Sequence, residues 1–212
     1  EGVVTEQILK GIRKVKMLKE NNQRLRHLSE EEADRLIDAC GKSRMKVLKP
    51  LVIFALNTGL RRSELFRLKH EDVDPVMGMI YVRDSKTGNP RHVPMTEDAQ
   101  WAYKEAAKVR SIGSPYVFGR VGGRQLQDIQ AAFTNAKVRA KIADLHFHDL
   151  RHTFASWLVM RGAELSTVME LLGHKNITMT LRYRHLSPKH KVDTVKLLEK
   201  KAENKKEQKV CQ

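Results

Sequence analysis

The chain has 212 residues, of which 41% are hydrophobic, and its formal net charge is +15. This length and composition can bury a core without cross-links, and no apolar run approaches the roughly 18 residues that predict a membrane span. The cysteines, Cys40 and Cys211, do not indicate a disulfide framework, which suits a reducing compartment. The charge favours nucleic acid as a partner, although a merely basic surface or an acidic membrane would also fit.

Residues 1–28 are basic and carry apolar residues at helical spacing, which predicts a short helix and a linker, or else a chain end without fixed structure. A folded domain is expected to begin at Ser29, because Ser29 and Glu32 form a capping-box pattern. The next predicted helix, 46–58, is almost entirely apolar. We therefore expect it to lie at the centre of the domain and to end at Gly59.

Residues 79–94 predict a β-hairpin with a basic tip. Met79–Arg83 and Arg91–Val93 have strand patterns, and the segment between them is rich in turn residues. Helical patterns then return over about 96–110, 125–140, 148–161, 164–172, 176–184 and 189–204. The predicted fold class is therefore mainly α with a small antiparallel β-sheet (α+β).

Two arginines, Arg61 and Arg62, follow closely on the glycine that ends the apolar helix. An arginine at such a junction is held at its backbone while its guanidinium stays free, and the planar guanidinium fork matches two phosphate oxygens. The simpler interpretation is an exposed arginine that pairs with Glu64.

A second cluster contains His148, Arg151 and His152, which share one face of a helix at spacings i, i+3 and i+4. Three interpretations compete. The two histidines could bind zinc, His152 could simply pack in the core, or Arg151 could bind a phosphate while His148 carries a proton. Zinc is disfavoured, because Arg151 would place a cation beside the metal and no cluster of cysteines or carboxylates supplies further ligands.

A third cluster begins at the helix end marked by Gly173, which His174 follows directly. Asn176 is expected to cap the next helix, and Tyr183 is expected about two turns into it. A lone tyrosine on a helix usually packs, and a lysine at a hairpin tip such as Lys86 is usually solvated. Each signal is therefore weak when it stands alone.

Together these motifs resemble the catalytic domain of tyrosine recombinases, the family that includes phage integrases, chromosome-dimer resolvases and conjugative-transposon integrases. The matching segments are Thr58-Gly59-Leu60-Arg61 with Glu64-Leu65, Ser85-Lys86-Thr87-Gly88, His148 to His152, Leu172-Gly173-His174, and Tyr183 to Pro188. The resemblance covers about residues 29–198. It implies a catalytic domain over 29–188, preceded in 1–28 by the end of a core-binding domain and followed in 189–212 by a C-terminal helix and a lysine-rich tail.

The resemblance implies a site-specific DNA recombinase that cleaves and rejoins strands through a 3′-phosphotyrosine. The implied catalytic residues are Arg61, Lys86, His148, Arg151, His174 and Tyr183. Arg61 and Arg151 would bind the phosphate, and His174 would donate a hydrogen bond to it. Tyr183 would be the nucleophile, His148 the candidate base, and Lys86 the acid that protonates the leaving 5′-oxygen. Glu64 and His152 would support these residues, Glu64 by holding the Arg61 loop and His152 by packing.

No metal or organic cofactor is implied. The implied partners are double-stranded DNA and other protomers of a DNA-bound synaptic tetramer, without a membrane. The implied protein is encoded by a bacterium or a phage and acts in the cytoplasm. Two alternatives stay open: a type IB topoisomerase, which relaxes supercoils without joining two duplexes, and a DNA-binding module without catalysis.

Overall fold

The structure is a computed structural model that describes residues 25–83, 90–109, 113–120, 122–187 and 195. Its elements in chain order are α2 (Glu30–Gly41), α3 (Leu48–Thr58), α4 (Arg62–Arg67), the 3-10 helix η1 (His70–Asp72), β1 (Val73–Asp74), β2 (Met79–Val82), β3 (Arg91–Pro94), α5 (Glu97–Val109), α6 (Gln130–Arg139), α7 (Asp149–Met160), α8 (Leu165–Leu172), α9 (Thr178–Leu181) and the 3-10 helix η2 (Arg184–Leu186). The predicted fold class, mainly helical with one small antiparallel sheet, is confirmed.

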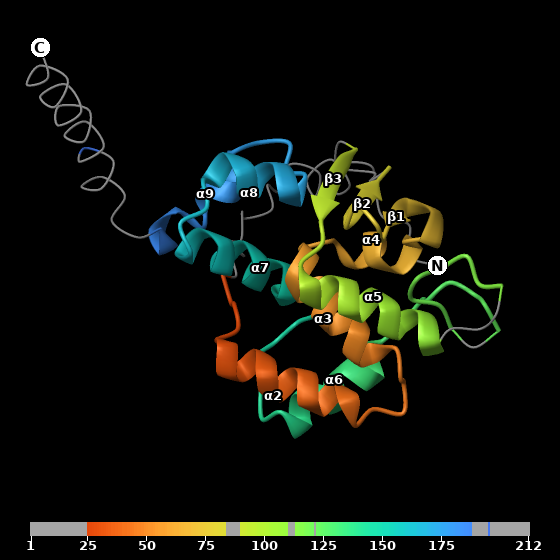
Figure 1. The fold of residues 1–212 in the computed structure, drawn as a ribbon. Coiled ribbons are helices and arrows are strands. Elements are labelled where there is room, and N and C mark those ends of the chain that lie inside the picture. The colour runs from red at the N-terminus through yellow and green to blue at the C-terminus, as the bar shows by residue number, and fades with distance from the viewer. Residues whose placement is uncertain (1–24, 84–89, 110–112, 121, 188–194, 196–212) are drawn as a thin grey trace, which may run out of the picture.

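Helix α3 lies at the centre of the helical body, where it packs against α2, α5 and α7 (Figure 1). Almost all of its side chains are buried, because a helix that is apolar on every side has to be covered on every side. Gly59 follows α3 with φ +60, and a Cβ at this position would lie 2.3 Å from Cδ1 of Phe154. The close approach of the end of α3 to α7 therefore requires glycine.

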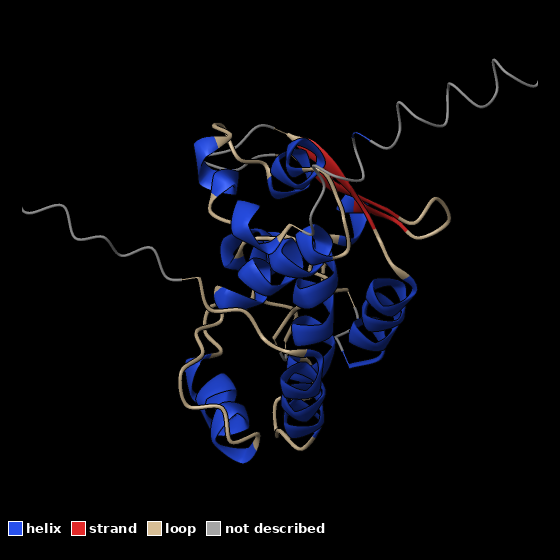
Figure 2. Cartoon of the chain, turned by 90° about the vertical axis from the view of Figure 1, so that its left-hand side faces the viewer, coloured by secondary structure: helices blue, strands red, loops and turns tan. Residues whose placement is uncertain are grey.

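Strands β1, β2 and β3 form an antiparallel sheet in that order, beside the helices (Figure 2). The predicted hairpin is confirmed, with Ile80 paired to Val93 in its register. The sequence pattern missed β1, which has only two residues and is too short to show a period of two. The hairpin tip, 84–89, lies outside the described residues, and Lys86 lies there with it.

Helix α6 begins at Gln130, not at 125 as the pattern predicted. Gln125 instead forms an isolated antiparallel bridge with Gly119, which keeps the preceding backbone extended. The side chain of Asp128 then accepts the N–H of Gln130 at 2.9 Å and starts the helix.

The helix predicted over 176–184 is shorter in the structure, where only α9 is α-helical. Asn176 does accept the N–H of Thr178 at its side-chain oxygen, as expected for a cap. The N–H of Tyr183 bonds to the carbonyl of Thr180, and the carbonyl of Tyr183 accepts from Leu186. These tighter i to i+3 bonds end the α-helix, so the prediction that Tyr183 lies two turns into a helix is wrong.

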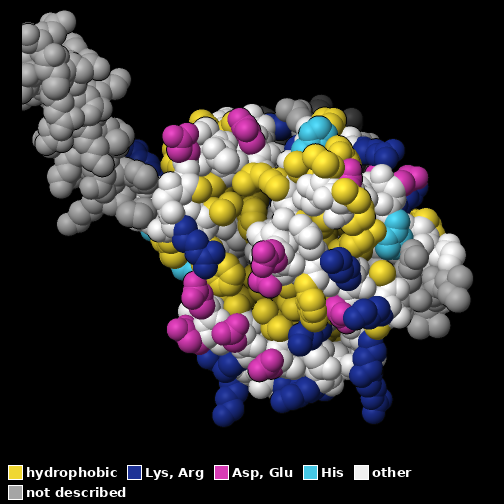
Figure 3. Space-filling view, in the orientation of Figure 1, with side chains coloured by type: hydrophobic (Ala, Val, Ile, Leu, Met, Phe, Trp, Pro, Cys, Tyr) yellow, Lys and Arg dark blue, Asp and Glu magenta, His cyan; other side chains and the backbone are white. Residues whose placement is uncertain are grey.

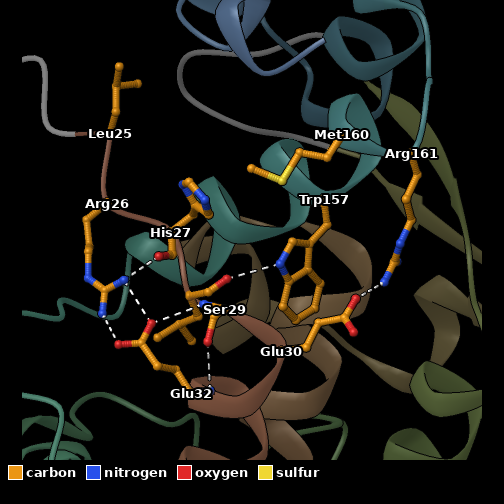
Figure 4. Close-up of a pocket in the computed structure, with 10 residues that line it drawn as sticks. Leu25, Arg26, His27, Ser29, Glu30, Glu32, Trp157, Met160 and Arg161 are labelled. Atoms are coloured by element: carbon orange, nitrogen blue, oxygen red, sulfur yellow. Dashed lines mark hydrogen bonds and ion pairs between the residues drawn. The ribbon is translucent and has the colours of Figure 1, made fainter. Parts of the chain in front are cut away.

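The segment before α2 packs across α2 and α7 (Figure 4). Leu28 is fully buried; its N–H donates to Oγ1 of Thr153 and its carbonyl accepts from the indole of Trp157, both at 3.0 Å. The capping box of Ser29 and Glu32 is confirmed. Residues 1–24, and 188–212 apart from residue 195, lie outside the described residues. The predicted N-terminal helix, the predicted C-terminal helix and tail, and the three-part division of the chain therefore stay predictions.

Among the described residues, no helix combines the length and the apolar character needed to cross a bilayer. Cys40 is buried in the core, and burial raises the pKa of its thiol to about 12, so it behaves as a small apolar side chain.

Candidate active site

The residues of the candidate site meet at the C-terminal end of α8. A helix end leaves carbonyl groups without intrahelical partners and carries partial negative charge. Three consecutive carbonyls there each accept a guanidinium N–H: Leu171 from Nε of Arg91 at 2.8 Å, Leu172 from Nη2 of Arg151 at 2.5 Å, and Gly173 from Nη2 of Arg61 at 3.0 Å. One helix end thus gathers arginines from three separate segments of the chain.

Arg151 lies in the first turn of α7, and only 4% of it is exposed. Besides the carbonyl of Leu172, its guanidinium binds the carbonyl of Gly59, from Nη1 at 2.8 Å. Two backbone carbonyls therefore fix the plane of the guanidinium, which has further N–H groups to offer a ligand. Burial, and then the charge of Arg61, lowers the pKa of Arg151, but a guanidinium still carries its charge at neutral pH.

Arg61 and Arg91 share the carboxylate of Glu64, whose side chain is only 5% exposed. Glu64 accepts Nη1 of Arg61 at 2.8 Å and both terminal nitrogens of Arg91 at 3.1 and 2.8 Å. Burial alone would raise the pKa of Glu64, but hydrogen bonds and charge from Arg91, and then from Arg61, bring it to about 2. The carboxylate is therefore ionised at neutral pH and offsets the repulsion between the two cations.

The geometry distinguishes Arg61 from its neighbour Arg62, the other arginine that follows the glycine at the end of α3. Arg62 is exposed and lies over the ring of Phe66, 5.4 Å from the centroid. Arg61, by contrast, is partly buried and turned toward Glu64 and α8. The structure thus places the first of the two arginines, and not the second, in the candidate site.

Arg91 was not among the residues predicted for the site, because the sequence pattern placed it only in a strand. A local signal was present: Arg91 lies two positions from Val93 on β3, so both side chains point to the same face of the sheet. Val93 is buried, and an arginine on the buried face of a strand indicates an ion pair. The partner, Glu64, could not be read from the sequence.

Tyr183 is 1% exposed, and its hydroxyl oxygen lies 2.5 Å from Nδ1 of His152, within hydrogen-bonding distance. Burial raises the pKa of Tyr183 to about 12. Burial, and then the neighbouring His148, lowers the pKa of His152 to about 4. At neutral pH the site therefore holds a protonated phenol against a neutral imidazole. The expectation that His152 packs is met by its 9% exposure, but the hydrogen bond to Tyr183 was not foreseen.

His148 precedes α7, and its side chain is exposed. Its ring stands edge-on to that of His152, with centroids 4.9 Å apart. Partial desolvation of the imidazole, and then the charge of Arg151, lowers the pKa of His148. An exposed, neutral imidazole at this position can meet a ligand that approaches from solvent.

His174 directly follows Gly173, and its Nδ1 lies 2.8 Å from Oγ1 of Thr180. Burial, and then the charge of Arg151, lowers its pKa to about 3. Arg182 adds another cation: its Nε is buried and has no hydrogen-bond partner among the described residues, and its charge lowers the pKa values of the three site histidines.

The structure therefore brings together every predicted catalytic residue that it describes, while the place of Lys86 stays a prediction. Within the described part of the chain, no group of three or more His, Cys, Asp or Glu side chains is arranged to hold a metal ion. A mainly helical α+β domain that gathers three carbonyl-anchored arginines, three histidines and a buried tyrosine at one helix end has the architecture of a tyrosine recombinase catalytic domain.

The sequence profile of the phage integrase family matches residues 26–190. The chain is 36% identical over 193 residues to the integrase of Salmonella phage P22, covering 83% of this chain and 48% of that protein. It is 30% identical over 203 residues to tyrosine recombinase XerA of Pyrococcus furiosus, covering 89% of this chain and 71% of XerA.

The solved catalytic domain of bacteriophage HP1 integrase superposes with a TM-score of 0.65 at 33% identity, covering 82% of this chain and 95% of that one. This chain belongs to the phage integrase family and has the catalytic-domain fold of the tyrosine recombinases. It spans about half the length of the P22 integrase and of other phage relatives that it matches.

Proposed function

We propose that this chain is the catalytic part of a site-specific DNA recombinase, an integrase, that cleaves and rejoins strands through a 3′-phosphotyrosine at Tyr183. The observation that carries the proposal is the convergence of Arg61 and Arg151 on consecutive carbonyls at the end of α8. The two arginines and the phenol lie close enough to interact electrostatically. The charge of Arg151 acts to lower the pKa of Tyr183, and the charge of Arg61 acts to lower the pKa of Arg151.

A phosphodiester is anionic and repels nucleophiles, and attack on it places more negative charge on the phosphate oxygens. Arg61 and Arg151 are held in place before the substrate arrives, so they stabilise this charge without reorganising. When the hydroxyl of Thr180 donates to Nδ1 of His174, the ring proton of His174 lies on Nε2. His174 can then donate a further hydrogen bond to a non-bridging oxygen.

In the proposed reaction the oxygen of Tyr183 attacks phosphorus and the bond to the 5′-oxygen breaks. A neutral histidine accepts the phenol proton, a role for which the family resemblance implies His148, and Lys86 protonates the leaving oxygen. The phosphotyrosine keeps the ester, so attack by a second 5′-hydroxyl rejoins the strand without ATP. Exchange between two duplexes implies double-stranded DNA and other protomers of a synaptic tetramer as partners, in the bacterial cytoplasm and away from a membrane.

The test first selects, from a pool of duplexes of random sequence, those that bind this chain. The selected duplexes are then prepared with a nick in one strand and used as substrates. The short strand beyond the nick diffuses away after cleavage, so a covalent adduct accumulates and is seen by denaturing electrophoresis. We expect an adduct with the unchanged chain and none with Tyr183→Phe, although Tyr183→Phe should still bind the duplex in a gel-shift assay. An adduct that survives Tyr183→Phe, or its absence from every recovered duplex, contradicts the proposal.

A further inference from the structure

We infer that His152, and not His148, accepts the proton of Tyr183 when the phenol oxygen attacks phosphorus. The inference rests on the proposed function and specifies one step of it. Nδ1 of His152 lies 2.5 Å from the hydroxyl oxygen, which is the atom that reacts. Direct contact with the reacting atom makes His152 a candidate catalytic residue.

The protonation states suit this step. The phenol, with its raised pKa of about 12, holds its proton at neutral pH, and the imidazole, with its lowered pKa of about 4, is neutral. A neutral imidazole carries one proton, so when this proton lies on Nε2 the phenol donates to Nδ1. An arriving phosphate brings negative charge, which raises the pKa of His152 and makes it a stronger base in the complex.

Several charged or titratable side chains surround His152. They are His148 just before α7, Asp149 and Arg151 from α7, His174 after α8, and Arg182 and Tyr183 after α9. Asp149 raises the pKa of His152, whereas His148, Arg182 and Arg151 lower it. The surroundings therefore favour a neutral ring until a phosphate enters the site.

His148, just before α7, and His152, within it, differ in what they face. His152 is buried against the phenol, whereas His148 is exposed and stands edge-on to the ring of His152. The hydrogen bond of the phenol goes to His152. His148 is consequently placed to meet DNA, and His152 to meet the nucleophile.

Protons and bonds balance in both directions of the reaction. In cleavage, the bond from the oxygen of Tyr183 to phosphorus forms, the bond to the 5′-oxygen breaks, and the phenol proton moves to Nδ1 of His152. The leaving oxygen takes its proton from the general acid. In rejoining, the oxygen of a 5′-hydroxyl bonds to phosphorus and gives its proton back to the deprotonated general acid, while the bond from phosphorus to the phenol oxygen breaks. The imidazolium returns its proton to the phenol oxygen, so His152 ends neutral.

The test compares His152→Asn with the matched variant His148→Asn on a nicked duplex that the unchanged chain cleaves. Asparagine at 152 can still accept a hydrogen bond from the phenol but cannot take its proton. We expect His152→Asn to slow single-turnover adduct formation by about 10²–10⁴-fold, while thermal unfolding and duplex binding stay close to those of the unchanged chain. Should His152→Asn fail to fold, His152→Gln provides a second side chain that is neutral and not basic.

The decisive readout is rescue by a phenol that needs no base. A fluorinated tyrosine at position 183 has a lower pKa, so it should restore much of the rate of the His152 variant at pH values where this phenol is ionised. It should raise the rate of the unchanged chain far less. A substrate with sulfur in place of the leaving 5′-oxygen, which needs no acid, should not rescue His152→Asn.

Other outcomes overturn the inference. If asparagine at 152 supports full activity, His152 only positions the phenol; if the fluorinated tyrosine rescues His148→Asn instead, the base is His148. Rescue of His152→Asn by the sulfur substrate would make His152 the acid. These results differ from failure of the proposed function, in which the unchanged chain itself forms no adduct at Tyr183.

Discussion

Glu64 holds two guanidinium groups at once, and both belong to the wall of the candidate site. Its carboxylate is ionised, almost inaccessible and bonded to Arg61 and Arg91. Removal of one charge from a buried network leaves the opposite charges uncompensated, which usually costs more than the network itself contributes. The position of Arg61 thus depends on a residue that never needs to touch DNA.

We expect Glu64→Gln to lower the free energy of unfolding by about 3 kcal/mol, because two buried cations lose their counter-charge. Adduct formation should fall as well, since Arg61 is no longer held toward α8. Urea denaturation and the nicked-duplex assay measure the two effects. The matched control is Glu30→Gln, because Glu30 and its partner Arg161 are 71% and 63% exposed and an exposed pair contributes little. Equal stability of the two variants would contradict the expectation.

At the scale of elements, the end of α8 organises the site. Its last carbonyls bind three arginines, and Gly173 ends the helix with φ +62. A Cβ at Gly173 would lie 2.9 Å from Nη1 of Arg91, so a side chain here would disturb the helix end and an arginine together. Glycine is therefore required by the backbone conformation and by the approach of Arg91.

Gly173→Ala should reduce adduct formation by more than its loss of stability explains. The matched control is Gly78→Ala in the turn between β1 and β2, where φ is +64 and the new Cβ would meet the side chain of Gln100, nearest at Nε2, 3.0 Å away. Both variants should lose about 1–2 kcal/mol of stability from the left-handed backbone conformation. Only Gly173→Ala should also shift Arg91 and slow cleavage. If both variants cleave equally well at temperatures where both are folded, α8 does not position the arginines.

At the scale of the whole molecule, the net positive charge does not make every face purely basic. The face shown in Figure 3 carries acidic and basic side chains together, with apolar side chains exposed between them. A face of mixed charge has no uniform attraction for a phosphate backbone. The net charge of +15 therefore favours a polyanion in general, while the proposed function places the scissile phosphate at the arginines of the candidate site.

Lowering the pH should reduce the free energy of unfolding already at pH values above those at which carboxylates titrate. The pKa values of His152 and His174 fall from 6.5 when unfolded to about 4 and about 3 when folded, and that of His148 is also lowered. Between these limits the unfolded chain binds more protons, so the free energy of unfolding decreases as pH falls from 6.5 toward 4. Each histidine contributes at most about 1.4 kcal/mol per pH unit, and less where solvent screens it.

Urea denaturation at a series of pH values from 7 to 4 measures this slope, and His174→Gln should make it shallower. Stability that stays constant or rises as pH falls through this window would show that the histidines are not held neutral. Below the usual pKa of a glutamate, 4.5, Glu64 should add a further loss, because its folded pKa of about 2 keeps it ionised only in the native state.

The sequence by itself determined the kinds of element and the identity of most site residues. An unbroken apolar run is buried wherever it lies, so α3 could be placed at the centre, and the capping box at Ser29 is a local contact. The order of the motifs indicated the family, and with it Arg61, Arg151, His174 and Tyr183. None of these inferences required knowledge of how one element packs on another.

Only the tertiary structure decided which side chains meet. Glu64 and Arg91 are 27 residues apart in the chain, and His152 and Tyr183 are 31 apart. Such contacts depend on the packing of α4 on β3 and of α7 on the link after α9, which periodicity does not encode. For the same reason the sequence could suggest that His152 packs, whereas the fold placed its Nδ1 against the hydroxyl of Tyr183. A local pattern specifies which face of a helix is buried, and the neighbouring element specifies what that face touches.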